Sequence, residues 1–168
     1  NEKSNFGLIE VICGSMFSGK TEELIRRIKK AKLSNFKTII FKPKIDSRNH
    51  GNYISTHNNN KHKAFIVSND NEILNISKKY QVIGIDEGQF FDNSLVEMGN
   101  KLANKGKRVI VAGLDMDFRG KPFGPMPNLM ATAEFVSKLH AVCKQTGGMA
   151  NYTNRKSKDK RKIKIGDD

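Results

Sequence analysis

The sequence predicts an α/β protein built on a parallel β-sheet with helices on both faces. Short apolar runs alternate with segments of helical periodicity along most of the 168 residues. Glycine or proline closes several of these segments, and the glycine-containing loop 14–21 joins the first apolar run to the first helical segment. Ligands bind beyond the carboxyl ends of the strands in such sheets, so we expect the functional site there.

The first elements follow this alternation. Residues 8–13 form an apolar run that ends in glycine, which is typical of a buried strand. Residues 20–33 place apolar side chains at helical spacing, with Lys and Arg on the opposite face. Residues 37–43 predict a second strand that proline ends, whereas residues 44–63 have no period and are rich in Asn, Ser and Gly. We expect a long flexible loop or β-arm there.

The middle of the chain continues the pattern. We expect a short strand at 64–68 and a helix with an Asx-type start at 70–80. Residues 81–86 predict a strand that ends in a carboxylate. A helix closed by glycine follows at 93–106, and an apolar strand at 107–114.

The C-terminal part is less regular. Residues 115–130 form a loop rich in Gly and Pro, which we expect to lead into a short helix near 128–133. Residues 134–143 predict a last strand. Residues 145–168 are polar and basic and offer little core.

Composition limits the classes of function. No apolar run approaches the ~20 residues of a membrane helix, and no secretory signal is recognised before Gly7. The two cysteines, Cys13 and Cys143, provide no disulfide framework, so we expect a cytoplasmic protein without membrane partners. A net charge of +13 can indicate a nucleic-acid binder. The absence of Trp, and only three Tyr, leave little aromatic surface for base stacking, so we do not expect nucleic acid as the main partner.

The loop "GSMFSGKT" matches the phosphate-binding pattern G-x-x-x-x-G-K-[ST] between a strand and a helix. Glycines let successive backbone N–H groups point inward, and the helix N-terminus adds positive charge. We expect Lys20 to reach the β- and γ-phosphates of a nucleoside triphosphate and Thr21 to coordinate Mg²⁺. The candidate nucleotide-binding residues are therefore Gly14, Ser15, Met16, Phe17, Ser18, Gly19, Lys20 and Thr21.

The segment "VIGIDEGQFF" supplies a second half of the site. Its apolar strand delivers Asp86 to the phosphate side, where a carboxylate can hold Mg²⁺ or its water. Glu87 follows at once and can take a proton from an attacking hydroxyl or water. An Asp-Glu pair that merely ends a strand remains the alternative interpretation. We also place Gln89 of this segment among the candidate nucleotide-binding residues.

The segment "LDMDFRGKPFG" follows another strand end and offers a place for an acceptor molecule. Phe118 and Phe123 could stack on a flat base, although both rings could equally belong to the core. Three readings follow: a deoxynucleoside kinase, a P-loop ATPase that acts on nucleic acid, and a regulatory nucleotide-binding module without turnover.

Five stretches together resemble the type II thymidine kinase family: "GSMFSGKTEELIRR", "FKPKIDSR", "VIGIDEGQFF", "GLDMDFRGKPFGP" and "KLHAVC". Their order and spacing match that family from Gly7 to Cys143, about four fifths of the chain. The resemblance implies transfer of the γ-phosphoryl of ATP to the 5′-hydroxyl of thymidine or deoxyuridine, with Mg²⁺, in the salvage route to dTTP. It also implies a homotetramer that dTTP inhibits.

The resemblance assigns roles to particular residues. Glu87 matches the general base, Asp86 the Mg²⁺-side carboxylate, and the "D-x-R" of Asp46 and Arg48 lies near the phosphates. It implies a base pocket lined by Met16, Leu114, Phe118 and Phe123, and closed by a lasso-like C-terminal segment. The expected contacts in that segment are Tyr152, Thr153, Ile163, Lys164, Ile165 and Gly166.

Family members usually hold a structural Zn²⁺ through two cysteine pairs. Here the first pair reads "CKQT", so Cys143 is at most one residual ligand, because threonine is a poor zinc ligand. The second pair should follow the "I-G" near residue 166, where the printed sequence stops at "KIGDD", so that this segment is either absent from the protein or not included in this sequence. The prediction is therefore an α/β P-loop (RecA-like) domain over residues 1–142 and a small lasso-type appendage, degenerate or incomplete, over 143–168.

Overall fold

A computed structural model describes residues 7–44, 51–56, 61–142 and 149–150 of the chain. Six parallel strands form one sheet in the order β5-β2-β6-β7-β1-β8. Their bounds are β1 Leu8–Gly14, β2 Thr38–Pro43, β5 Phe65–Val67, β6 Val82–Ile85, β7 Arg108–Gly113 and β8 Phe135–Leu139. The α/β fold with a parallel sheet is confirmed.

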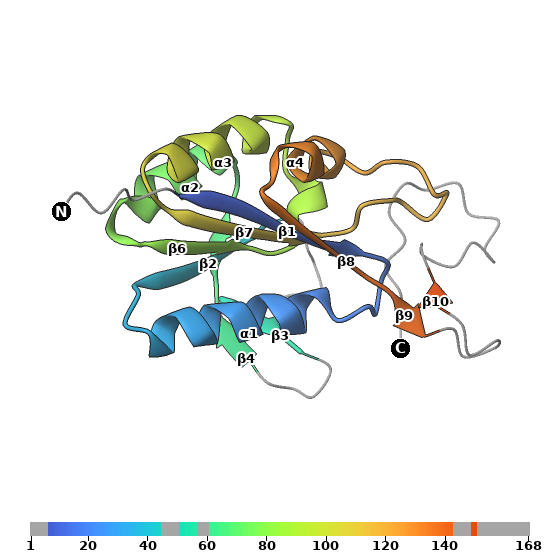
Figure 1. Ribbon diagram of the computed structural model, residues 1–168, viewed down its shortest axis with the longest axis horizontal. Helices are drawn as coiled ribbons and strands as arrows, with labels where there is room; N and C mark the ends of the chain where they lie inside the picture. The colour runs from blue at the N-terminus through green and yellow to red at the C-terminus, as the bar shows by residue number, and fades with distance from the viewer. Residues whose placement is uncertain (1–6, 45–50, 57–60, 143–148, 151–168) are drawn as a thin grey trace.

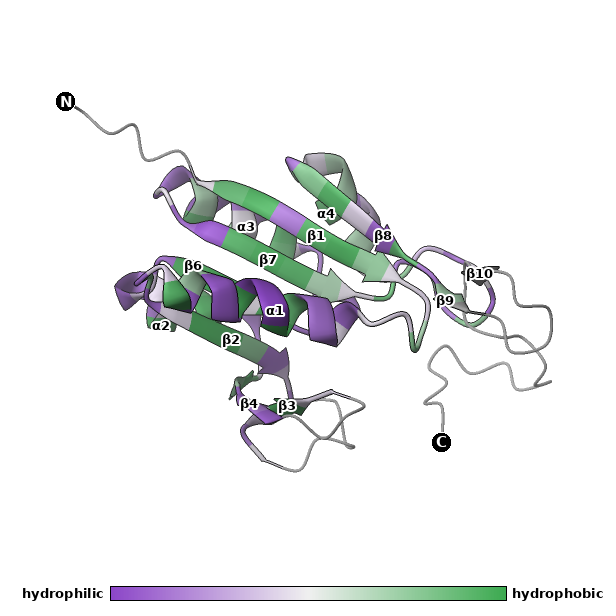
Figure 2. Ribbon diagram, turned by 60° about the horizontal axis from the view of Figure 1, so that its bottom comes forward, coloured by the Kyte–Doolittle hydropathy of each residue, from purple (hydrophilic) through white to green (hydrophobic). Residues whose placement is uncertain are grey.

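Helices cover both faces of the sheet (Figure 1). One face carries α1 (Lys20–Leu33), and the other carries α2 (Asp70–Ile76), α3 (Ser94–Asn104) and α4 (Met126–Thr132). The buried side chains accordingly form two apolar clusters, one on each face of the sheet. Figure 2 shows the apolar strands beside a helix α1 whose outer surface is polar. The amphipathic spacing in 20–33 produces this arrangement, because Leu24, Ile25, Ile28 and Ala31 are its buried residues.

The sequence located most elements and erred at their ends. The helix expected at 70–80 ends at Ile76 and continues as the 3₁₀ turn η1, Ser77–Lys79. Its N-cap is Asn69, whose side chain accepts the Glu72 amide hydrogen bond. The helix expected near 128–133 already begins at Met126, next to a proline that suits a helix start.

Two other regions differ from the expectation in kind. The strand expected at 134–143 is interrupted at His140 and divides into β8 and the short β9, Ala141–Val142, which pairs with β10, Met149–Ala150. Within 44–63, the structure contains the antiparallel hairpin of β3 (Tyr53–Ser55) and β4 (Lys61–Lys63). The β-arm alternative is therefore correct for that part. Buried Lys42 donates a hydrogen bond to the Tyr53 carbonyl oxygen at 2.6 Å and so ties the hairpin to β2.

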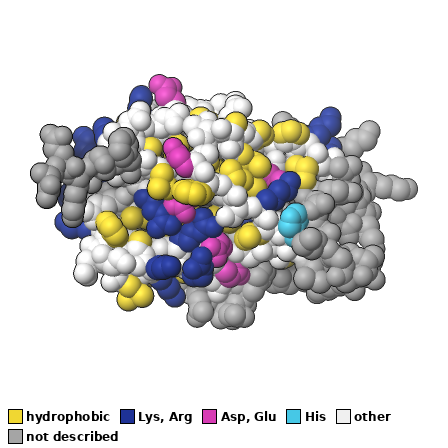
Figure 3. Space-filling model, in the orientation of Figure 1, with side chains coloured by type: hydrophobic (Ala, Val, Ile, Leu, Met, Phe, Trp, Pro, Cys, Tyr) yellow, Lys and Arg dark blue, Asp and Glu magenta, His cyan; other side chains and the backbone are white. Residues whose placement is uncertain are grey.

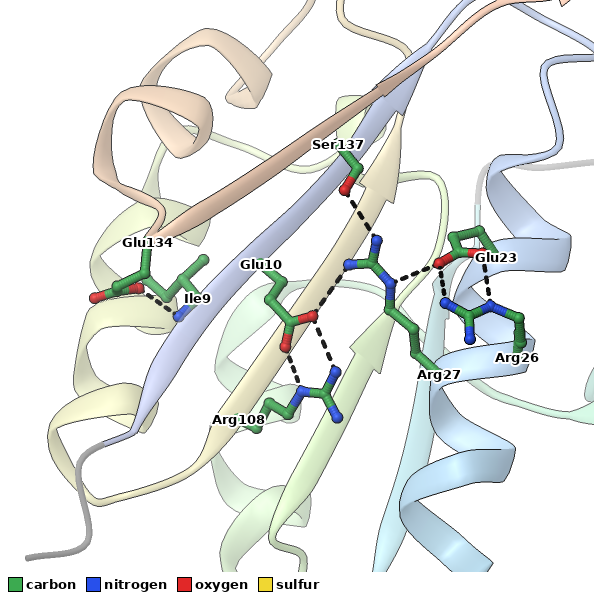
Figure 4. Close-up of polar contacts among 8 residues, drawn as sticks. All are labelled: Ile9, Glu10, Glu23, Arg26, Arg27, Arg108, Glu134 and Ser137. Carbon is green, nitrogen blue, oxygen red and sulfur yellow. Dashed lines mark hydrogen bonds and ion pairs between the residues drawn. The ribbon is translucent and has the colours of Figure 1, made fainter.

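A charged cluster lies over the sheet beside α1, away from the carboxyl ends of the strands (Figure 4). Glu10 of β1 is buried and binds both Arg108 and Arg27, and Arg27 also contacts Glu23 and Ser137. Glu10, Arg27, Arg108 and Ser137 border a hollow of about 490 Å³ together with the exposed Phe135. Figure 3 shows the basic side chains gathered on this face with acidic and apolar ones around them. The guanidinium groups of Arg27 and Arg108 are therefore already neutralised by carboxylates.

Among the described residues, no helix is long and apolar enough to cross a bilayer.

Candidate functional site

The loop from Gly14 to Gly19 connects β1 to α1 at the carboxyl edge of the sheet. Three of its residues have positive φ: Gly14 at 144°, Phe17 at 60° and Gly19 at 88°. Alternation of this kind turns backbone N–H groups toward a common centre, which is how an anion nest forms. Phe17 adopts this left-handed backbone at a conformational cost although the residue is 54% exposed.

Gly14 also lets the loop pass close to the neighbouring strand. A Cβ atom at this position would lie 2.2 Å from the Leu139 carbonyl oxygen of β8. No side chain fits there, so the first glycine of the motif is required by the sheet as well as by the loop.

Lys20 begins α1 and lies across the loop. Its ammonium donates hydrogen bonds to the Ser15 carbonyl oxygen at 2.6 Å and to the Ser18 hydroxyl at 3.4 Å. Burial lowers the pKa of Lys20, while the charges of Glu87, Asp86 and Asp115 oppose that shift. The Lys20 ammonium is thus held against the loop itself, through Ser15 and Ser18.

Asp86 follows β6 and meets Thr21 beneath the loop. The Thr21 hydroxyl lies 3.4 and 3.3 Å from the two Asp86 carboxylate oxygens, so it donates only a weak hydrogen bond. Asp86 is 4% exposed. Burial, and next the Glu87 carboxylate, raise the pKa of Asp86 to about 7. A buried carboxylate without a full counter-charge is a group that a cation would stabilise.

Glu87 leaves the strand end in a left-handed conformation, with φ of 54°. A non-glycine residue there is strained, and such strain concentrates at functional positions. The turn η2, Gly88–Phe90, follows and brings Gln89 back beside Glu87. The Gln89 amide donates to the Glu87 carboxylate at 2.6 Å. The glutamate is therefore oriented by a side chain that is itself 97% buried, since Gln89 is 3% exposed.

The same Gln89 side chain connects Glu87 to the loop after β7. Its amide oxygen accepts the Leu114 backbone N–H at 3.0 Å. On the next residue, the Phe90 ring packs edge-on against Phe123, with ring centroids 5.8 Å apart. Gly124 completes the contact, because a Cβ there would lie 2.3 Å from the Gln89 carbonyl oxygen. The segment 114–124 is thus fastened directly to the turn that carries Glu87.

The loop 115–123 is closed on itself. Met116 bridges Pro122, and the Asp117 N–H donates to the Lys121 carbonyl oxygen at 2.8 Å. The Asp117 carboxylate accepts the Arg119 and Lys121 backbone N–H groups at 2.9 and 3.1 Å. These hydrogen bonds lower the pKa of Asp117 against its burial. A preorganised loop of this kind can hold a flat ligand without first becoming ordered.

The expected base-contacting residues separate into two groups. Met16, Leu114 and Phe123 are partly exposed. Met16 belongs to the same loop as Lys20, whereas Leu114 and Phe123 contact the turn that follows Glu87 through Gln89 and Phe90. Phe118 is 7% exposed, with the Arg119 guanidinium 5.7 Å from its ring, so most of this ring already packs within the protein. Asp46, Arg48, Cys143 and the contacts expected at 152–166 lie outside the described residues.

Sequence reasoning missed two residues of this region. Asp115 is 6% exposed and forms an ion pair with Lys138 of β8 at 2.9 Å. Asp115 follows a strand end, as Asp86 does, and that position was the available signal. No comparable signal singled out Lys138, because lysines are frequent throughout the chain.

The family model described as "Thymidine kinase" matches residues 7–168. A thymidine kinase of Bacteroides fragilis is 50% identical over 161 residues, which cover 96% of this chain and 81% of that protein. A thymidine kinase of Porphyromonas gingivalis is 50% identical over 96% of this chain and 79% of its own length. One from Rhodothermus sp. is 47% identical over 95% of this chain and 75% of its own.

Among solved structures, the replication initiator DnaA bound to AMPPCP and single-stranded DNA has a similar fold, with a TM-score of 0.50. It is 15% identical and the match covers 80% of this chain but 40% of the DnaA chain. This likeness concerns the fold alone.

Proposed function

The chain belongs to the thymidine kinase family, whose activity is an ATP-dependent phosphoryl transfer, and we propose that it phosphorylates the 5′-hydroxyl of thymidine in the cleft described above. One observation carries the proposal. Gln89 hydrogen-bonds both the Glu87 carboxylate and the Leu114 backbone, so the proton acceptor and the nucleoside loop are positioned by one buried side chain.

The loop 14–21 binds the triphosphate of ATP. Its inward N–H groups and the N-terminus of α1 supply fixed positive potential, which requires no reorganisation as charge develops. Lys20 shifts from the Ser15 carbonyl to the β- and γ-phosphate oxygens. Asp46 and Arg48 remain expected phosphate-side residues by resemblance.

Glu87 accepts the proton of the attacking 5′-hydroxyl. Its partly exposed carboxylate is held by Gln89 on the side of the cleft that also carries Leu114. A base in hydrogen-bond reach of the nucleophile contributes about 10²–10⁴ in rate. Asp86 is less suited to this role, because it is buried below the loop against Thr21.

Thr21 and Asp86 fit Mg²⁺. Both present hard oxygen donors, which this ion prefers, and the buried Asp86 carboxylate gains the counter-charge it otherwise lacks. When bound, Mg²⁺ would neutralise charge on the β- and γ-phosphates. A Cys-x-x-Cys pair of zinc ligands does not fit residues 143–146, because Thr146 stands where the second thiolate would be.

The thymine ring lies against Leu114, Phe123 and Met16, with Phe118 supporting the loop from inside. We retain the C-terminal contacts at Tyr152, Thr153 and 163–166 as part of this proposal. A cytoplasmic homotetramer inhibited by dTTP is the assembly and regulation that the resemblance favours. β8 ends the sheet among the residues that the structure describes, and Phe135 and Val136 are 61% and 42% exposed, which supports association of copies through this strand.

The direct test is ADP release from Mg-ATP with thymidine, deoxyuridine, deoxycytidine or single-stranded DNA added in turn. We expect stimulation by thymidine and deoxyuridine, and little by deoxycytidine or DNA. Stimulation by DNA alone would favour a nucleic-acid-dependent ATPase, for which the net charge of +13 is the supporting observation. Nucleotide binding without turnover under all conditions would contradict both.

A further inference from the structure

Asp115, a buried carboxylate in an ion pair, lies at the carboxyl edge of the sheet between β8 and the loop 114–124, the nucleoside loop. Asp115 Oδ2 is 2.9 Å from Lys138 Nζ. The carboxylate is 6% exposed, whereas the lysine side chain is 40% exposed. The pair therefore consists of a buried carboxylate and a lysine whose ammonium group reaches it from the protein surface.

Asp115 occupies the neck of the nucleoside loop. It follows Leu114, and its carbonyl oxygen accepts the Phe123 N–H at 3.0 Å, so both ends of the loop meet at this residue. Leu114 and Phe123 are the proposed base contacts. A displacement of the Asp115 side chain would consequently move both of them together.

Lys138 anchors this neck to the edge strand. It lies beside Cys13 in the register of β1 and β8, while Gly113, just before the neck, lies on the other side of Cys13. The ion pair thus spans β1 and joins β7 to β8 at the level of the phosphate loop. Within the part of the chain that the structure describes, β8 pairs with β1 alone, so this side-chain link restrains β8 at its cleft end.

An ion pair is not needed merely to hold this loop to β8. A buried carboxylate is costly unless it is paired and fully hydrogen-bonded, and apolar residues often stabilise a core better than an ion pair. Asp115 Oδ1 is buried and has no hydrogen-bond partner among the described residues. The Asp115 charge also acts on Lys20 of the phosphate loop. Such an incompletely satisfied charge is typical of a functional position.

We propose that the Asp115–Lys138 pair positions the nucleoside side of the cleft and so sets the affinity for thymidine, independently of ATP binding. This inference rests on the proposed function. Asp115 and Lys138 act through Leu114 and Phe123 and do not take part in the proton transfer.

The test compares steady-state kinetics of the full chain carrying Lys138→Met, Lys138→Arg or Asp115→Asn. We expect Lys138→Met and Asp115→Asn to raise the KM for thymidine about 10-fold or more. The KM for ATP should stay within about twofold in Lys138→Met, which leaves the Asp115 charge near Lys20 in place. Lys138→Arg retains the charge and should restore the thymidine KM to within about threefold of the unmodified protein. The matched control is Lys101→Met, because Lys101 also pairs with a carboxylate, that of Glu97, but on the exposed face of α3. It should change neither KM.

Calorimetric binding of thymidine and thermal unfolding complete the design. The weaker thymidine binding should persist without ATP. Lys138→Met should melt below the Lys101→Met control, because it leaves the buried Asp115 carboxylate unpaired, so binding is measured at a temperature at which both variants are folded. An unchanged thymidine KM in Lys138→Met, an equal rise in both KM values, or no rescue by arginine would overturn the proposal. If the unmodified protein itself does not phosphorylate thymidine, the proposed function fails instead, so the two failures are distinguishable.

Discussion

Individual residues of the site have different environments although they adjoin in sequence. Asp86 is 4% exposed and lies against Thr21, and its pKa is raised to about 7 mainly by burial. Glu87 lies partly exposed in a strained conformation beside Gln89. One carboxylate therefore suits cation binding and the next suits proton transfer.

The raised pKa of Asp86 predicts how nucleotide-free stability depends on pH. The folded protein binds this proton more tightly than the unfolded chain, whose pKa is near 3.8. The unfolded chain loses the proton first, so stability falls as pH rises from about 4 through 7. Asp86→Asn should remove this loss, by about 4 kcal/mol at most at pH 8.

Melting temperatures in chelator, with and without Asp86→Asn, check this prediction. The variant should melt higher than the unmodified protein at pH 8, and the difference should shrink at pH 5, where Asp86 is largely protonated. A variant that melts lower at pH 8 would show that the Asp86 charge is already compensated in the apoprotein.

At the scale of elements, two glycines differ in whether the structure needs glycine at that position. Gly99 lies within α3, where an added Cβ would meet Ile9 Cδ1 at 3.6 Å, an ordinary contact. Gly99→Ala should therefore raise the free energy of unfolding by about 0.5–1 kcal/mol, through lower entropy of the unfolded chain. Urea denaturation measures this change, and a destabilised variant would contradict the reading of α3.

Gly124 is the opposite case. Its φ is 53°, and a Cβ would lie 2.3 Å from the Gln89 carbonyl oxygen. Gly124→Ala should lower the free energy of unfolding by about 1–3 kcal/mol, because the new Cβ would clash with the Gln89 backbone and the alanine would have to adopt a left-handed conformation. It should also reduce kcat, since it displaces the turn that carries Glu87. Wild-type kinetics in a folded Gly124→Ala protein would argue against the close contact.

The sequence predicted the elements through their apolar spacing and the phosphate loop through its glycines. Helix ends were harder, because a 3₁₀ turn such as η1 continues the helical pattern with different hydrogen bonds. The Gln89–Leu114 hydrogen bond and the Asp115–Lys138 pair could not be predicted, since they join residues 25 and 23 positions apart in the sequence. Phe118 illustrates the limit best: the loop was identified, but its pattern did not indicate which ring is buried.

At the scale of the whole molecule, β8 is the last strand of the six-stranded sheet among the described residues, and two of its apolar side chains are exposed. If copies associate through this edge, Phe135→Lys with Val136→Lys should shift the protein to smaller species in light scattering. Ile76→Lys, at an exposed apolar position on α2, is the matched control and should leave the mass unchanged. An unaltered mass in the double variant would exclude this edge as the interface.

The account depends on the phosphate loop, Glu87 and the nucleoside loop acting in one cleft. Single-turnover phosphorylation of thymidine by Glu87→Gln, measured together with ATP binding, tests it most directly. We predict a rate lower by about 10²–10⁴ with the Kd for ATP within about threefold, while Glu97→Gln on exposed α3 behaves as the unmodified protein. Full activity in Glu87→Gln would contradict the assignment of the base and, with it, this arrangement of the site.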